Sequence, residues 1–265
     1  MTSLFQNWEV GSDFHWAGKP QGPFLNWPEP YRLFASGREA LLAIWDCLKH
    51  NNKHSLFVPE YFCNEVVTWW QKQGIIIRRY TDAPHMVSPV WETLAVSQGD
   101  AVLAVNYFGV RDGNIWREWR RANNEVLMIE DHSHDPLSGW ALVSDADFVF
   151  ASLHKTFPAP DGAILWSPKD LTLPDEPLFG DWTSSALKLA AMVLKRDYIF
   201  GDSNQVKDNF REFQRKGDLA FSNGKTAAVS PWSRFLLASG YPIAWRVKRE
   251  ENVKTFLDLI SKSSS

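Results

Sequence analysis

The sequence has few cysteines, no long apolar runs and little net charge, and each of these scarcities excludes a class of protein. Two cysteines, Cys47 and Cys63, cannot make a disulfide framework, so we expect a reducing, cytoplasmic environment. No apolar run reaches membrane-spanning length and the N-terminus lacks the features of a signal peptide, so we expect no membrane partner. A net charge of -3 over 265 residues gives no reason to expect nucleic acid as a partner.

What the sequence does contain is an alternation of short apolar runs with amphipathic segments. The apolar runs predict buried strands over residues 55–58, 75–80, 101–108, 126–129, 147–151 and 163–166. The amphipathic segments predict helices over residues 34–49, 63–73, 116–123, 184–199, 206–215 and 246–260, with another beginning at 230. We expect Ser36 and Glu39 to form a capping box, and Pro59 to stop the first strand. The alternation predicts an α/β fold with a mostly parallel central sheet and helices on both faces.

Lys155 lies in a polar break between two of the apolar runs, with Ser152 and His154 just before it and a turn rich in proline and glycine after it. Taken alone, a lysine is most often a solvated surface residue. Its neighbours favour chemistry, because Ser152 can donate a hydroxyl to a phosphate and His154 can carry a proton. We expect burial and a cationic neighbour to lower the pKa of Lys155, as imine chemistry requires.

Asp131 follows another apolar run, within the segment Glu130-Asp-His-Ser-His134. The plain interpretation is a solvated strand end or a helix cap. The alternative is an ion pair between Asp131 and the protonated ring nitrogen of pyridoxal phosphate (PLP), whose aldehyde Lys155 would hold. His134 would then lie near the phenolic oxygen of the ring, while His132 would have no direct role. Ligands collect beyond the carboxyl ends of such strands, where we expect Asn106, Asp131 and Ser152.

A metal site is a rival interpretation of the same segment. Five side chains could be ligands, namely Asp131, His132, His134, Asp135 and His154. Their spacing matches no standard zinc pattern, and no cysteine joins them. The sequence therefore favours PLP and no metal.

Ser36, Gly37 and Arg38 stand at the start of the first predicted helix. Free backbone N–H groups and the positive end of the helix dipole suit a phosphate there, and glycine allows a close approach. Any capped helix carries the same signal, so its value comes from Lys155 and Asp131 further along the chain.

With these residues in place, the chain resembles the DegT/DnrJ/StrS family of PLP-dependent aminotransferases, which have the aspartate aminotransferase type of fold. Six family motifs appear in the family's order over nearly the whole chain. They are Ser36-Gly-Arg-Glu-Ala-Leu41, Val58-Pro-Glu-Tyr-Phe-Cys63, Val105-Asn-Tyr-Phe-Gly109, Glu130-Asp-His-Ser-His134, Ser152-Leu-His-Lys155 with Asp161-Gly162, and Arg249-Glu-Glu-Asn252.

The resemblance implies a role for each site residue. Lys155 would be the Schiff-base lysine, Asp131 the partner of the ring nitrogen, and His134 a contact of the phenolic oxygen. The phosphate would be held by Ser36, Gly37 and Ser152, and Tyr61 or Phe62 would stack on the ring. Arg38 replaces a small hydroxyl residue of the family motif, so its charge would either add to the phosphate site or point away from it.

The resemblance also implies a domain division and an activity. Residues 1–30 would be an N-terminal arm, 31–245 the PLP-binding major domain, and 246–265 the start of a small C-terminal domain that is missing or truncated. The expected reaction moves an amino group from an amino acid to a keto group, most often of a nucleotide-linked sugar, in a homodimer. A PLP-fold protein without turnover, acting in regulation or as a partner subunit, is the alternative.

Overall fold

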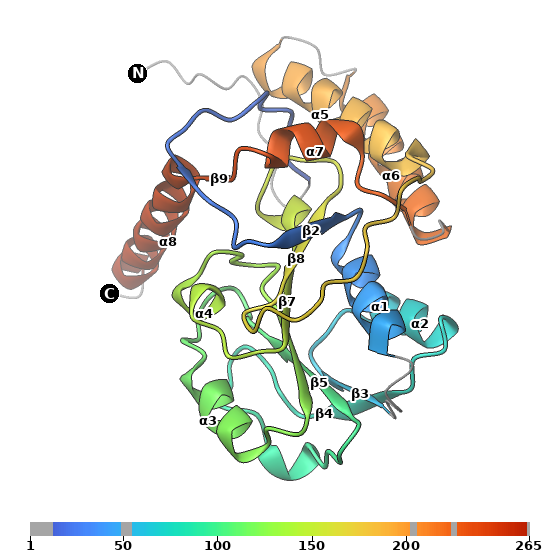
Figure 1. The fold of residues 1–265 in the computed structure, drawn as a ribbon. Helices are drawn as coiled ribbons and strands as arrows, with labels where there is room; N and C mark the ends of the chain where they lie inside the picture. The colour runs from blue at the N-terminus through green and yellow to red at the C-terminus, as the bar shows by residue number, and fades with distance from the viewer. Residues whose placement is uncertain (1–12, 49–54, 202–205, 224–226, 264–265) are drawn as a thin grey trace.

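The computed structural model describes residues 13–48, 55–201, 206–223 and 227–263. At its centre is a seven-stranded sheet, shown in Figure 1. In spatial order its strands are β2 (Tyr31–Phe34), β8 (Ala163–Trp166), β7 (Phe148–Ser152), β6 (Leu127–Asp131), β5 (Ala101–Val105), β3 (Leu56–Pro59) and β4 (Ile77–Tyr80). Neighbours from β7 to β4 are parallel, whereas β8 is antiparallel to both β7 and β2. The predicted α/β class and mostly parallel sheet are therefore confirmed.

The central strands are apolar along their whole length because helices cover both of their faces. Strands β5, β7 and β8 are buried at every position. One core lies between the sheet and helices α1 (Gly37–Leu48) and α2 (Asn64–Lys72). The other core lies on the opposite face, under α3 (Asn114–Ala122), the short α4 (Gly139–Leu142) and α7 (Pro231–Leu237). Burial on both faces explains why these strands show no polar alternation.

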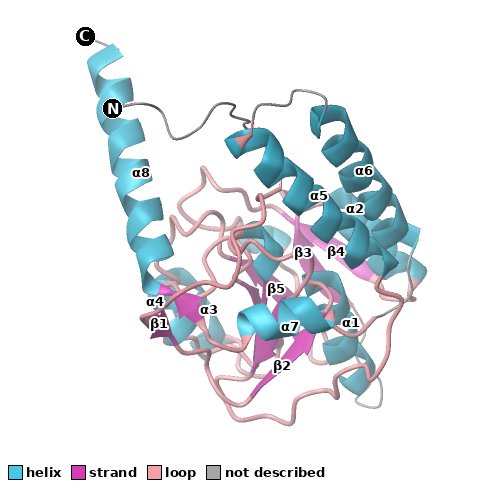
Figure 2. Cartoon of the chain, turned by 90° about the horizontal axis from the view of Figure 1, so that it is seen from above, coloured by secondary structure: helices cyan, strands magenta, loops and turns pink. Residues whose placement is uncertain are grey.

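Two helical parts stand outside this layered body. Helices α5 (Thr183–Phe200) and α6 (Val206–Asn223) pack against each other as a hairpin with a small apolar cluster of its own. Helix α8 (Ile243–Ser263) projects from the body, as Figure 2 shows. Across the described residues, no helix has the length and apolar character needed to cross a bilayer.

Several local predictions were wrong. The Ser36 hydroxyl is buried without a hydrogen-bond partner, so no capping box forms at α1. Pro59 was expected to stop the first strand, but it is the last residue of β3. Three short strands were missed, β2 and the pair β1 (Phe24–Leu25) and β9 (Tyr241–Pro242), because their pairing joins distant parts of the chain. Helix α6 runs eight residues beyond its predicted end at 215, and α8 includes 261–263 of the expected tail.

The sheet topology brings the carboxyl ends of several strands to a single edge. Strands β3, β5, β6 and β7 are parallel, so their carboxyl ends lie together. Strand β8 is antiparallel to β7 and pairs Ala163 with both Ser152 and Phe34. The end of β2 and the start of α1 therefore reach the same edge, where α/β folds place their ligands.

Candidate active site

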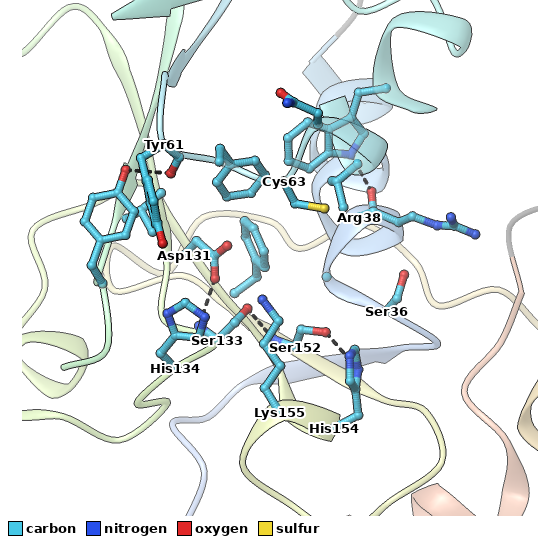
Figure 3. Close-up of a pocket in the computed structure, with 18 of the residues that line it drawn as sticks. Ser36, Arg38, Tyr61, Cys63, Asp131, Ser133, His134, Ser152, His154 and Lys155 are labelled. Atoms are coloured by element: carbon cyan, nitrogen blue, oxygen red, sulfur yellow. Dashed lines mark hydrogen bonds between the residues drawn. The ribbon is translucent and has the colours of Figure 1, made fainter. Parts of the chain in front are cut away.

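A cavity of about 680 Å³ opens at this edge of the sheet, and Figure 3 shows its side chains. Its walls come from α1, the ends of β3, β5, β6 and β7, and the end of α6. Every residue predicted to bind the cofactor lines it: Ser36, Gly37, Arg38, Tyr61, Phe62, Asp131, His134, Ser152 and Lys155. The fold thus brings together residues that lie up to 119 positions apart in the sequence.

Lys155 closes a short 3-10 turn (Leu153–Lys155) that follows β7. Its side chain points into the cavity on the side of Asp131, as Figure 3 shows. Within the described residues, its amine has no hydrogen-bond or ion-pair partner. The expected burial was wrong, because this side chain is exposed at the open face of the cavity. A free, accessible amine in a concave site is what attack on an aldehyde requires.

Asp131 is the last residue of β6 and is only 5% exposed. One carboxylate oxygen accepts the backbone N–H of Ser133 at 2.8 Å, and the Ser133 hydroxyl accepts the backbone N–H of Ser152 at 2.8 Å. The second oxygen of Asp131 has no partner among the described residues, which leaves an acceptor for a ligand. Ser133 was missed by sequence analysis because its role is to join the ends of β6 and β7.

His134 has its protonation state and tautomer set by its surroundings. Burial lowers its pKa, and so does the nearby amine of Lys155, which keeps the ring neutral at pH 7. Its Nδ1 accepts the backbone N–H of Phe108 at 3.2 Å, so the proton lies on Nε2. The Phe108 ring stacks on His134 with centroids 4.7 Å apart. His134 is therefore a fixed hydrogen-bond donor at the cavity.

Phe108 itself adopts a backbone conformation that is rare for a bulky residue. Its φ is 55°, in the left-handed region, three residues after the end of β5. This conformation accompanies the bond from its N–H to His134. Strain of this kind is usually held at functional sites, where the surrounding structure enforces it.

The start of α1 offers an anion site. The hydroxyl of Ser36 is buried and lines the cavity without a well-formed hydrogen bond, although the Glu39 carboxyl lies close enough to interact with it. The first N–H groups of a helix have no partners within the helix either. Gly37 packs against Phe150 so closely that an added Cβ would lie 3.0 Å from its ring. A buried polar group without a partner is rare, and a phosphate would satisfy it.

Ser152 adds a second hydroxyl to this end of the cavity. Its Oγ lies 3.2 Å from Nδ1 of His154. Burial lowers the pKa of His154 to about 3, with further lowering by Lys188 and Lys155, so the ring is neutral and a poor proton carrier. When Nδ1 carries the proton, His154 donates to Ser152 and leaves the Ser152 hydroxyl free to donate to an anion.

The aromatic wall distinguishes the two candidates for ring stacking. Phe62 is stacked on Trp70 with centroids 5.6 Å apart and packs against the core. Tyr61 is 54% exposed and touches Tyr107 only edge-on. The Tyr107 hydroxyl, whose pKa burial raises, donates to the Tyr61 carbonyl at 3.0 Å and so fixes its backbone. The structure therefore favours Tyr61 over Phe62 as the stacking ring.

His132 and Asn106 lie behind the cavity wall and not in it. His132 is fully buried between Glu130, at 2.9 Å, and Asn106, at 3.1 Å. Asn106 was expected at the ligand edge, but its side chain is turned into this network. In the described part of the chain, no three His, Cys, Asp or Glu side chains gather as metal ligands.

Glu39 is the one acidic side chain buried at the start of α1. Burial raises its pKa to about 7, against the lowering effect of the neighbouring Arg38. When protonated, Glu39 places no negative charge near the anion site. The guanidinium of Arg38 turns away from the cavity toward α6, and neither arrangement follows from the sequence.

Some solved structures resemble this chain at low sequence identity. No protein-family model matches the sequence. No curated protein matches it either. A protein described as a sugar aminotransferase from Streptococcus pneumoniae, in its PLP form, is 15% identical, covers 80% of this chain and 50% of its own, and has a TM-score of 0.43.

Two further solved structures differ in the activity that they carry. A DegT DnrJ EryC1 StrS aminotransferase from Brucella abortus is 15% identical over 52% of this chain and 41% of its own, with a TM-score of 0.41. A sphingosine-1-phosphate lyase from Burkholderia pseudomallei is 14% identical over 51% of this chain and 37% of its own, with a TM-score of 0.39. This chain spans half or less of the length of all three proteins.

Proposed function

We propose that this protein is a PLP-dependent aminotransferase of the DegT/DnrJ/StrS type. One observation carries the proposal: the free amine of Lys155 and the spare oxygen of Asp131 face the same cavity as the unpartnered hydroxyl of Ser36. An amine, a carboxylate and an anion site are the three features that hold the aldehyde, the ring nitrogen and the phosphate of PLP.

The residues present fit the cofactor. Ser36, Ser152 and the first N–H groups of α1 would hold the phosphate, and Asp131 would pair with the ring nitrogen. The Nε2 proton of His134 would be donated to the phenolic oxygen, and the ring of Tyr61 would cover one face. When bound, PLP supplies an electron sink for the carbon next to the substrate amine.

The chain's own residues would then handle protons and orientation. Nζ of Lys155 can take a proton from the substrate carbon and return it at a neighbouring position, because the amine is accessible and free of partners. Ser133 holds the Asp131 carboxylate in place at 2.8 Å, where it would face the ring nitrogen. His134 stays neutral and so does not compete with Lys155 for the proton.

The net reaction exchanges an amine for a carbonyl oxygen. An amino acid donor becomes a keto acid, and the acceptor's keto group becomes an amine, so atoms and electrons balance over the two halves. We propose a keto sugar linked to a nucleotide as the acceptor, since the resemblance to the family favours it. A homodimer and a cytoplasmic location belong to the same proposal.

Reconstitution with PLP tests the proposal directly. Purified protein should develop an absorbance band in the near-ultraviolet to blue range, and borohydride should fix the cofactor on the peptide that carries Lys155. The Lys155→Ala variant should lose both the fixed cofactor and at least about a thousandfold of the amine transfer. It should keep its stability within about 0.5 kcal/mol, because the side chain is exposed.

A second exposed lysine provides the matched control. Lys72, at the end of α2, does not line the cavity, so Lys72→Ala should behave as the wild type. The same fixed adduct in Lys155→Ala would refute the assignment. Cofactor binding without transfer from any amino acid to a panel of keto sugars would instead support the alternative of a binding protein without turnover.

A further inference from the structure

The guanidinium of Arg38 is held by α6 and not by the anion site. Its central carbon lies 3.9 Å from the centre of the Phe221 ring and 4.6 Å from that of Trp69. One terminal nitrogen also donates to the carbonyl of Phe221 at 2.5 Å. In Figure 3 the side chain of Arg38 points away from Ser36 and the centre of the cavity.

We propose that Arg38 is a positioning residue that pins the last turn of α6 to α1, so that Phe221 forms a wall of the substrate space and sets the size of the acceptor. This inference rests on the proposed function for the identity of the ligand. The contact itself depends only on the fold.

The last turn of α6 suits such a contact. Its final carbonyls have no partners within the helix, and a cation there also interacts favourably with the helix dipole. Arg38 supplies a donor and a charge, while the two aromatic rings lie against its flat faces. A lysine would keep the charge but lose the stacking of the planar group.

Other contacts hold α5 and α6 together at this same end of the hairpin. The Ser184 hydroxyl donates to the Gly217 carbonyl at 2.8 Å, and Lys188 pairs with Asp218 at 2.7 Å. Both contacts join α5 to α6, and the Lys188 amine also lies 5.5 Å from the centre of the Phe221 ring. The Ser185 hydroxyl ties α5 to Asp161 at 2.8 Å, whereas Arg38 ties the last turn of α6 directly to α1.

Phe221 makes the contact relevant to the substrate because it lines the cavity together with Arg38. A side chain whose planar group is already stacked and hydrogen-bonded to α6 cannot also reach a phosphate at Ser36. Arg38 therefore takes the place of the family's small hydroxyl residue without taking over its contact. Loss of the contact between Arg38 and Phe221 would let α6 move and open the cavity to larger acceptors.

Four variants test the pin: Arg38→Met, Arg38→Lys, Phe221→Ala and, as a matched control, Arg121→Met on the exposed face of α3. The first measurement is hydrogen exchange of the cofactor-free protein. Arg38→Met should raise exchange in peptides covering 212–221 by at least about tenfold, while peptides from the sheet stay unchanged. Arg38→Lys should fall between the wild type and Arg38→Met.

The second measurement is binding and turnover. Arg38→Met should change the affinity for PLP, and for inorganic phosphate as a bare probe, by less than about threefold. Phe221→Ala and Arg38→Met should both lower KM for bulkier keto acceptors relative to small ones. Arg121→Met should match the wild type throughout.

The outcomes separate this inference from the proposed function. Unchanged hydrogen exchange in α6 of Arg38→Met would overturn the inference. A loss of phosphate affinity of tenfold or more in this variant, with a smaller loss in high salt, would also overturn it and would make Arg38 a phosphate ligand. Failure to bind PLP at all would remove the proposed function, yet the exchange data would still decide whether Arg38 pins α6.

Discussion

The two ends of the central sheet each carry a buried aspartate, and the two carboxylates differ in how many hydrogen bonds they receive. Asp147, just before β7, is 7% exposed and receives bonds from Arg120 at 3.0 and 3.1 Å, from Lys169 at 2.9 Å and from the backbone of Met128 at 2.7 Å. Asp131, at the other end of β6, is 5% exposed and receives one bond, from the backbone of Ser133.

This difference distinguishes polar groups that are hydrogen-bonded within the chain from polar groups that are available to a ligand. At the Asp147 end, both carboxylate oxygens of Asp147 are matched by donors of the chain itself, as buried charges require. At the Asp131 end, a carboxylate oxygen, the amine of Lys155 and the hydroxyl of Ser36 have no partners among the described residues. Both ends are buried in the same sheet, so the mismatch at one end points to a bound molecule.

The largest effect is expected at the unmatched end. Asp131→Asn keeps the shape and the bond from Ser133 but removes the charge beside the ring nitrogen. Amine transfer should fall about a thousandfold, equivalent to about 4 kcal/mol of transition-state stabilisation, while the melting temperature hardly changes. Steady-state kinetics and thermal unfolding of the same preparation measure both.

Asp131→Glu is the matched control, because it keeps the charge on a longer side chain and should recover part of the rate. If Asp131→Asn kept wild-type turnover, the charge would have no catalytic role and the comparison of the two ends would fail.

The opposite pattern, a loss of stability without a loss of turnover, is expected at the Asp147 end. Asp147→Ala leaves Arg120 buried without its partner, so the free energy of unfolding should fall by about 3 kcal/mol. Turnover per folded molecule should remain that of the wild type, because Asp147 lies at the far end of the strands. Chemical denaturation gives the first quantity and kinetics normalised to folded protein the second.

Lys169→Met provides the control at that end. Its side chain is 37% exposed, so its pair with Asp147 should contribute under about 1 kcal/mol. A large loss of turnover in folded Asp147→Ala would show that the two ends are coupled and not separate.

The sequence predicted the buried parts of the fold well and the edges poorly. Strands β5, β7 and β8 were found because continuous burial on two faces leaves an unbroken apolar run. Strand β2 was missed because Tyr31–Phe34 follows Pro30 and includes Arg32, and its only partner, β8, lies 129 or more residues away. Local pattern carries no information about such pairing.

The candidate site shows the same limit. Lys155, Asp131 and Ser36 were identified because each lies shortly after a predicted strand or near the start of a predicted helix, and topology then brings those ends together. Phe221 was missed because it reaches the cavity only through the docking of α5 and α6. The buried state expected of Lys155 was wrong because sequence does not show how open a cavity is.

The next effect is expected from Glu39, whose buried carboxyl destabilises the folded protein when it is ionised. Its pKa is raised to about 7 in the folded state, so unfolding releases its proton and stability falls as pH rises from about 4.5 through 7. Glu39→Gln removes this term. The variant should be about 3 kcal/mol more stable than the wild type at pH 8, relative to the difference at pH 4.

Urea denaturation at the two pH values measures this double difference. Asp46→Asn, on the exposed side of the same helix, should leave the pH dependence unchanged. An equal gain at both pH values would mean that Glu39 acts through packing and not through its charge.

The smallest effect is expected from His154, which has the opposite sign. Its pKa is lowered to about 3 by burial, so the unfolded chain takes up a proton that the folded protein refuses. Its contribution is complete above pH 6.5 and is lost progressively as pH falls toward 3. On acidification from pH 7 to 5, the wild type should therefore lose about 2 kcal/mol more stability than His154→Gln, which cannot titrate. The constant cost of losing the Ser152 contact cancels in this difference between pH values. Equal losses in the two proteins would show that the ring is reached by water and titrates normally, and Ser152 would then face a cation, not a neutral ring, in the acidic range.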